Sequence, residues 1–466
     1  MKSYRDLDGP PALPVIGNLH QIRLNRLHLT LERWADRYGP LYRARLGPIR
    51  VVAVSDAAAV RQVHRERPGR FRRWRAIEAV AREIGMLGVF AAEGRDWRRH
   101  RGLVAAGLNA ARVRPFFPKL AVVVGRLQRK WERAADAGET TDLCRDLMRL
   151  TVDVTGQLAF GIDFNTVETE GPVIQRHLDR VFPMVHRRIN APLAWWRYVR
   201  LPADRAFDRA LAELRTEVDG IIGEARARLR ASPALRDSPS NFLEAIIAAG
   251  EDGRGRFSDT DIFANVCTLL LAGEDTTAHT IAWTVHCFMQ HPEHFARARA
   301  EVDGVIAPAA AVGEPEQIEW FPFLDAVCNE SMRLKPVAPV NSLEPVEDVE
   351  ILGHTIPRGT MVMALNRHIA MQDGNFGDGA RFDPERWLAG AAPGCPHDTD
   401  AFIPFGSGPR FCPGRSLALL QIRTVLAMFC RNFGVEPAFP ARPVEEKHAF
   451  TMMPENLLVR LSRRAS

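Results

Sequence analysis

The sequence predicts a mainly helical fold with a minor β component, folded as one large domain over its 466 residues. Three observations carry this prediction. Residues 56–334 repeat apolar side chains at three- and four-residue spacing, which is typical of helices packed on a core. Short segments of alternating polarity lie before and after that region, as expected of strands. No internal repeat, low-complexity tract or compositional break marks a linker, so one domain over 1–466 is the economical interpretation.

The elements are expected in the following order. A helix over 28–38 ends at Gly39-Pro40, and LYRARL and IRVVAVS then form a hairpin around Gly47-Pro48. The main helices are expected near 94–109, 115–137, 142–160, 204–231, 258–290 and 322–335. The segment VEILGHTIPRGTMVM predicts a second hairpin around Gly353-His354. A long irregular loop over 372–404, a helix from Cys412 to about 431 and a last strand, NLLVRL, complete the chain.

Composition excludes several classes of protein. With 46% hydrophobic and 25% charged residues, the chain is neither disordered nor collagen-like. A net charge of +6 on so long a chain does not predict nucleic-acid binding. The N-terminus resembles no export signal and no run of about 18 apolar residues occurs, so no membrane span is expected. The seven cysteines form no CxxC pair, which argues against disulfides or a zinc ribbon and favours a cytoplasmic, reducing location.

The segment Phe405-Gly-Ser-Gly-Pro-Arg-Phe-Cys-Pro-Gly414 carries the strongest chemical signal. Its glycines and prolines predict a tight loop with an exposed backbone, and Cys412 lies where that loop becomes a helix. A thiol at a helix N-terminus faces the positive end of the dipole and free amides, and both effects favour the thiolate, which binds soft metals. The other six cysteines are interpreted as small buried apolar residues.

This loop resembles the haem-binding signature of the cytochrome P-450 family at each of its fixed positions, which are Phe405, Gly408, Arg410, Cys412 and Gly414. Three further family motifs follow the expected order. They are Ala272-Gly-Glu-Asp-Thr-Thr277, Glu330-Ser-Met-Arg333 and Pro384-Glu-Arg-Trp387. The resemblance covers nearly the whole chain. It implies a triangular helical prism with small sheets and a long central oxygen-groove helix, haem b, and monooxygenase activity. The Arg- and Ala-rich composition favours a bacterial source, and a monomer is expected.

The resemblance also implies a role for individual residues. Cys412 is the axial ligand of the haem iron, and Phe405 packs beside its sulfur and limits water access. Ala272 and Gly273 belong to the oxygen groove, where Thr276 and Asp275 deliver protons. Glycine and Thr/Asp residues disfavour a helix interior, so this polar interruption of an apolar helix calls for a functional reason.

Charged residues of three further motifs have structural or binding roles under the same resemblance. Glu330 and Arg333 should form a buried network with Arg386, whereas an isolated pair at this spacing would be a surface ion pair. Haem propionates need cations, and the matching residues are Trp97, Arg101 and Arg410. The family often carries a cation ten residues after the ExxR arginine, and that position is Leu343 here. Either another residue neutralises one propionate, or that propionate is more exposed.

The expected partners follow from the chemistry. Electrons should come from NAD(P)H through a separate ferredoxin or flavodoxin and its reductase, since no such domain is recognised in the chain; a basic patch of Arg98, Arg99, Arg415 and Arg423 is the expected docking face. The substrate should be an apolar steroid, terpenoid or fatty acid, enclosed by the segments 70–90, 182–196, 337–340 and 451–453. The Arg-rich segment 70–75 is either an exposed loop or a grip for a substrate carboxylate.

Three alternatives remain open at this stage. A peroxide-driven peroxygenase would keep the haem, although the pair Asp275-Thr276 argues against it. A haem sensor or carrier would lack turnover. A haem-free metal site made of Cys395, His397 and Cys412 fits no zinc spacing.

Overall fold

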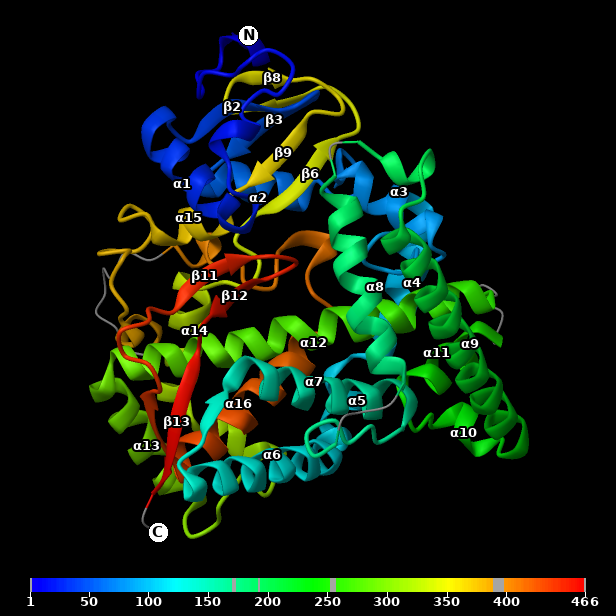
Figure 1. Ribbon diagram of the computed structural model, residues 1–466, viewed down its shortest axis with the longest axis vertical. Coiled ribbons are helices and arrows are strands. Elements are labelled where there is room, and N and C mark those ends of the chain that lie inside the picture. The colour runs from blue at the N-terminus through cyan, green and yellow to red at the C-terminus, as the bar shows by residue number, and fades with distance from the viewer. Residues whose placement is uncertain (1, 170–172, 192, 252–256, 389–397, 465–466) are drawn as a thin grey trace.

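The structure is a computed structural model that describes residues 2–464, apart from 170–172, 192, 252–256 and 389–397. Helices make up most of the molecule, and a smaller sheet-rich part holds the N-terminus at one end (Figure 1). The prediction of a mainly α fold with minor β structure is confirmed. Within the described residues, none of the helices has both the length and the apolar character that crossing a bilayer requires.

The α-helices of the described residues include a long central one, α12, which crosses the molecule in Figure 1. They are α1 (Leu27–Tyr38), α2 (Ala57–Arg65), α3 (Arg75–Glu83), α4 (Gly94–Gly107), α5 (Ala110–Val113), α6 (Phe117–Ala137), α7 (Leu143–Phe160), α8 (Val173–Ile189), α9 (Pro202–Ala231), α10 (Ala234–Asp237), α11 (Phe242–Glu251), α12 (Asp259–Gln290), α13 (Pro292–Ile306), α14 (Pro322–Leu334), α15 (Asn366–Met371) and α16 (Arg415–Asn432). All six main helices expected in the middle of the chain are present within a few residues of their predicted limits.

Within the residues that the structure describes, the strands form four small sheets. The strands are β1 (Lys2–Ser3), β2 (Leu41–Leu46), β3 (Ile49–Val54), β4 (Phe71–Arg73), β5 (Thr140–Asp142), β6 (Asn341–Pro345), β7 (Val349–Ile351), β8 (His354–Ile356), β9 (Met361–Ala364), β10 (Phe433–Pro437), β11 (Glu445–His448), β12 (Met452–Glu455) and β13 (Leu458–Arg463). The largest sheet has the order β2-β3-β9-β6-β4; β3 and β9 are parallel and its other neighbours are antiparallel. Both predicted hairpins, β2–β3 and β7–β8, are confirmed.

Local sequence explains where α12 begins and how it is held. Ser258 and Asp261 form a reciprocal capping box at its N-terminus, in which each side chain accepts a hydrogen bond from the other residue's backbone N–H. The helix has 32 residues, a length of about 48 Å. Most of its side chains are buried, and α7, α14 and α16 pack against it. This long rigid element forms one wall of the cavity described below.

Candidate functional site

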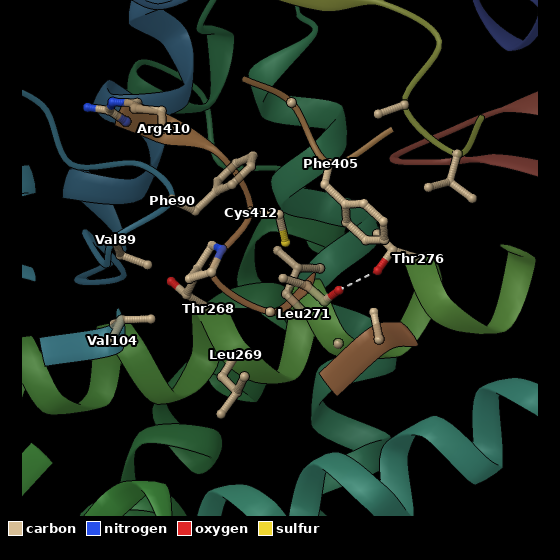
Figure 2. A pocket seen from close by; sticks show the side chains of 18 of the residues that line it. Val89, Phe90, Val104, Thr268, Leu269, Leu271, Thr276, Phe405, Arg410 and Cys412 are labelled. Carbon is tan, nitrogen blue, oxygen red and sulfur yellow. Dashed lines mark hydrogen bonds between the residues drawn. The ribbon is translucent and has the colours of Figure 1, made fainter. Parts of the chain in front are cut away.

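A cavity with a volume of about 340 Å³ lies between α12 and the loop that carries Cys412. Figure 2 shows the sulfur of Cys412 directed toward the part of α12 that carries Leu271 and Thr276. Four groups of side chains line the cavity: the sulfur loop, the polar segment of α12, a cluster of cations and an apolar wall. Segments far apart in the sequence therefore meet at one place.

Backbone geometry holds the sulfur loop in place. The N–H of Cys412 donates to the carbonyl of Phe405 at 2.8 Å, which closes the loop. Gly408 has φ +68° and packs so closely on α2 that a Cβ there would lie 2.6 Å from the carbonyl oxygen of His64. Only glycine combines this backbone conformation with this close approach. Phe405 and Cys412 both line the cavity, as predicted.

The ionisation of the thiol differs from the expectation. Burial raises the pKa of Cys412, and this effect exceeds the lowering by backbone N–H groups of Gly414 and Arg415 and by the charges of Arg101 and Arg73. The helix N-terminus and the cations therefore act as expected, but they do not by themselves make the thiolate the favoured form. A bound metal deprotonates a coordinating thiol outright and would supply the missing stabilisation.

The opposite wall is the polar segment of α12. The hydroxyl of Thr276 donates to the carbonyl of Ala272 at 2.7 Å, and both residues line the cavity together with Gly273 (Figure 2). A Cβ on Gly273 would lie 2.7 Å from Oγ1 of Thr155 on α7, so glycine allows the two helices to approach closely. Asp275, by contrast, does not line the cavity. The helix continues without interruption through this segment, so its special chemistry resides in side chains and not in a break of the helix.

One end of the cavity is strongly cationic. The predicted residues Trp97, Arg101 and Arg410 all line it. Arg410 pairs with Glu93 at 2.5 Å and stacks over the Trp97 ring, yet its Nε and Nη1 have no hydrogen-bond partner among the described residues. Arg101 donates to the carbonyl of Phe411 at 2.8 Å. Burial lowers the pKa of Arg410 to about 10.

Sequence reasoning missed two further cations at this end, Arg67 and Arg73, which also line the cavity. Arg67 is 4% exposed, and within the part of the chain that the structure describes its Nε and Nη2 have no hydrogen-bond partner; Nε of Arg73 has none there either. Burial lowers the pKa of Arg73 to about 10 and that of Arg67 well below its usual value. The unusually basic segment 70–75 was the available signal, but nothing in it distinguished Arg73 from its neighbours.

The interpretation of segment 70–75 as an exposed loop is wrong. Residues 71–73 form β4, and the arginines around it are neutralised by glutamates of the chain. Arg70 pairs with Glu347, and Arg75 pairs with Glu344. Arg73 is the member of this segment that reaches the cavity.

The network around Glu330 is buried, which excludes a surface ion pair. Glu330 and Arg333 are both 0% exposed and make two parallel hydrogen bonds of 2.7 and 2.8 Å. Arg386 donates to the same carboxylate at 3.1 Å, as predicted, and the indole N–H of Trp387 donates at 2.9 Å. Arg333 also donates to carbonyl oxygens of the connector that follows α15. The network therefore fastens that connector to α14.

Apolar side chains form the rest of the cavity wall. Three of the four predicted segments contribute, with Ile77, Val89, Phe90, Phe182, Val185 and Val337. The fourth, 451–453, does not, and the adjacent Phe450 takes its place. Phe90 and Phe450, which both line the cavity, lie 6.0 Å apart between ring centroids. This wall suits a ligand with a largely hydrocarbon surface.

Two of the four arginines expected on the sulfur-side surface are neutralised within the chain. Arg99 pairs with Asp261 at 3.0 Å, and Arg423 makes two bonds of 2.6 Å to Asp325. Arg98 and Arg415 are exposed.

The metal-site alternative involved Cys395 and His397, which lie outside the described residues. Four of the other cysteines, Cys267, Cys287, Cys328 and Cys430, are buried as expected.

The residues present fit a haem. One thiol faces the interior of an apolar cavity from a helix N-terminus, and buried guanidinium nitrogens without partners gather at one edge, where two carboxylates would satisfy them. A soft sulfur ligand and cations for propionates are what an iron porphyrin requires.

Comparison with known proteins agrees with this geometry. Residues 7–461 match the family model described as Cytochrome P450. The mitochondrial 25-hydroxyvitamin D-1 alpha hydroxylase of Rattus norvegicus is 29% identical, over 98% of this chain and 93% of its own length. Cyclooctat-9-en-7-ol 5-monooxygenase of Streptomyces melanosporofaciens is also 29% identical, over 92% and 89%.

Two further matches bear on the extent of the fold. A self-sufficient cytochrome P450 monooxygenase of Aspergillus niger is 29% identical over 99% of this chain, which spans only 43% of that protein's length. The crystal structure of the cytochrome P450DA heme domain superposes with a TM-score of 0.87 at 23% identity and covers 98% of both chains.

Proposed function

The chain belongs to the cytochrome P450 family and is a haem-dependent monooxygenase, and on that premise we propose that it hydroxylates or epoxidises an apolar small molecule with electrons from a separate redox protein. The observation that carries the proposal is the placement of one thiol, Cys412, across an apolar cavity from the hydroxyl of Thr276. Haem bound to a cysteine thiolate supplies the activation of O2, because the ligand donates electron density that favours O–O cleavage.

The chain's own residues then divide the remaining tasks. Cys412 is the proposed iron ligand, and the ring of Phe405 beside the loop restricts water around the sulfur. Thr276 holds a hydroxyl at the cavity surface, where it can pass a proton inward. Asp275 is proposed as its link to solvent, since it lies next to Thr276 but outside the cavity lining. Ala272 and Gly273 provide the small-residue surface that leaves room beside the hydroxyl.

The substrate is proposed to be a neutral, largely hydrocarbon molecule of the steroid or terpenoid type. The apolar cavity wall supports this class, and so do relatives named for a vitamin D and for cyclooctat-9-en-7-ol. A fatty acid is less well supported, because the arginines around β4 other than Arg73 are paired with glutamates. Difference-spectrum titration of a long-chain acid and its methyl ester tests this choice: clearly tighter binding of the acid would contradict it.

The electron donor is proposed to be a ferredoxin or flavodoxin that docks on the sulfur side through the exposed Arg98 and Arg415. Reversing both charges should slow reduction by such a donor and weaken its salt dependence. Reversing Arg236, which is also exposed but lies on α10, is the control. Equal reduction rates in the double variant and the wild type would exclude this docking face.

The deciding experiment concerns Cys412. The ferrous protein under carbon monoxide should show the red-shifted Soret band of a thiolate-ligated haem, and Cys412→Ser should lose that band and all O2-dependent turnover. Cys144→Ser, at a half-buried thiol that does not line the cavity, is the matched control and should keep both. A Cys412→Ser protein with an unchanged spectrum and activity would exclude Cys412 as the ligand. Turnover with peroxide but none with O2 and electron donors would replace the proposal with a peroxygenase.

A further inference from the structure

The corner between α12 and α13 carries three polar side chains that take no part in lining the cavity. They are His291, Glu293 and His294, which lie on either side of Pro292 in the sequence. One nitrogen of each imidazole and one carboxylate oxygen lie within 4.8 Å of one another. Three such atoms can hold a single metal ion, so this corner is a candidate metal site outside the haem cavity.

The distances among the three ligand atoms suit an ion placed between them. Oε1 of Glu293 lies 3.6 Å from Nδ1 of His291 and 3.8 Å from Nε2 of His294, and both separations are too long for hydrogen bonds. Zinc binds imidazole nitrogen and carboxylate oxygen at about 2.0–2.2 Å in a tetrahedron, which places neighbouring ligand atoms about 3.4 Å apart. Two of the three separations are therefore within about 0.5 Å of those in a zinc site.

Backbone hydrogen bonds hold the three residues at this corner. His291 follows the last turn of α12, where its N–H donates to the carbonyl of Cys287 at 2.9 Å. Its own carbonyl accepts from the N–H groups of His294 and Phe295, both at 3.1 Å, in the first turn of α13. Pro292 begins α13 and restricts the backbone further. Two helix ends therefore fix the positions of the ligand residues.

Ring packing holds the two imidazoles. The ring of His291 stacks on that of Phe382, with centroids 4.6 Å apart and an angle of 15° between the planes. His294 meets the same phenyl ring edge-on at 5.7 Å. The side chains of His291 and His294 are 34% and 20% exposed, whereas that of Glu293 is 64% exposed. The imidazoles are thus arranged in advance, which lowers the entropy cost of binding, and the carboxylate is open to an ion from solvent.

The donor set and the nearby charges favour zinc over magnesium or calcium. Imidazole nitrogen is a good ligand for zinc, whereas magnesium and calcium prefer sites made of oxygen atoms. Arg297 lies one turn further along α13 than Glu293, but it pairs with Glu385 and lies 4.0 Å over the ring of Phe323. The charge of Arg297 is therefore balanced by Glu385, which leaves the carboxylate of Glu293 for a metal ion.

We propose that His291, Glu293 and His294 bind one zinc ion, with water as the fourth ligand. The proposal does not rest on the proposed function, because the three residues lie outside the haem cavity.

The proposed ion would stabilise the sulfur side of the molecule. Both imidazoles pack on Phe382, which precedes Asp383, and the N–H of Asp383 donates to Glu330 at 2.8 Å. Zinc would thus join the corner between α12 and α13 to the connector that the Glu330 network fastens. An ion that binds only the folded chain raises its stability by mass action.

Zinc binding to the haem-loaded protein, prepared without a histidine tag, tests the proposal. Equilibrium dialysis against zinc chloride should show one tightly bound zinc ion per chain, which excess magnesium chloride does not displace. His294→Gln and Glu293→Gln should each weaken binding about tenfold or more, because losing a residue that merely supports a zinc ligand already costs that much. His20→Gln, at an exposed histidine near the N-terminus, is the matched control and should bind zinc as the wild type does.

The midpoint of thermal unfolding measures the effect on stability. Zinc chloride should raise the midpoint of the wild type and of His20→Gln, and it should leave the midpoints of the two site variants almost unchanged. Three results would overturn the proposal: equal zinc binding by the wild type and His294→Gln, an equal loss in His20→Gln, or displacement of zinc by magnesium. If His294→Gln accumulates poorly, Glu293→Gln decides in the same way, because its exposed side chain can be replaced without disturbing the core.

Discussion

The sulfur side and the substrate side of the cavity are built on different principles. On the sulfur side, a buried carboxylate gathers several donors: Glu330 alone accepts from Arg333, Arg386, Trp387 and the backbone of Asp383. On the substrate side, the wall consists of apolar side chains such as Phe90 and Phe450, which share only their shape and hydrophobicity. We therefore expect the sulfur side to tolerate few side-chain substitutions and the substrate side to tolerate many apolar substitutions of similar volume.

The largest effect should come from breaking the network on the sulfur side. Glu330→Gln removes the charge that two buried arginines share and should lower the free energy of unfolding by about 3–5 kcal/mol. Chemical denaturation of the holoprotein measures this loss. The control, Glu385→Gln, removes an exposed carboxylate that pairs with Arg297 and should cost less than about 1 kcal/mol. Equal losses in the two variants would show that the buried network contributes no more to the free energy of unfolding than an exposed ion pair.

An intermediate effect is expected at Thr276, where a polar group interrupts the substrate side. Thr276→Ala should reduce product formation about 10²-fold while the protein still binds ligands, because only the proton donor is removed. Product formed per NAD(P)H consumed is the measurement. Thr284→Ala removes a similar hydroxyl–carbonyl bond two turns later on α12, outside the cavity, and should leave that ratio unchanged. A wild-type ratio of product to NAD(P)H in Thr276→Ala would exclude this residue from the proton path.

The smallest effect should come from the apolar wall. Phe90→Ala should weaken binding of an apolar ligand about tenfold, because the apolar area that the ring presents to the ligand is lost. The dissociation constant from a difference-spectrum titration measures this change. Phe90→Leu keeps most of the apolar volume and should bind nearly as wild type. A larger loss in Phe90→Leu than in Phe90→Ala would mean that ring geometry, and not apolar area, sets the affinity.

The same contrast explains which features the sequence predicted. The sulfur loop, the Glu330 network and Thr276 depend on short segments whose spacing fixes their chemistry, and the structure brings each to its expected surroundings. Arg73 was missed because its place at the cavity depends on the pairing of β4 with β6, some 270 residues apart in the sequence. Arg67, just beyond α2, was missed because it lies in no recognised motif. The short strands β4, β6 and β11 were missed because FRR, NSLEP and EEKH show little of the apolar alternation that identifies a strand.

The raised pKa of Cys412 shows a further limit of local reasoning. The position at a helix N-terminus was correctly inferred, but the depth of burial that opposes it depends on packing by distant segments. Asp275 is a similar case, since adjacency to Thr276 in sequence did not bring it into the cavity lining.

The parallel pairing of β3 with β9 has a consequence for biosynthesis. Val51–Val54 are fully buried, yet their partners Met361–Ala364 emerge from the ribosome about 310 residues later. At 5–20 residues per second, the early hairpin waits about 15–60 s for its neighbour, with an apolar edge uncovered. We expect arrested nascent chains that end before residue 341 to bind a chaperone, and chains well past residue 364 to be released; equal capture of both would show that the hairpin is protected in some other way.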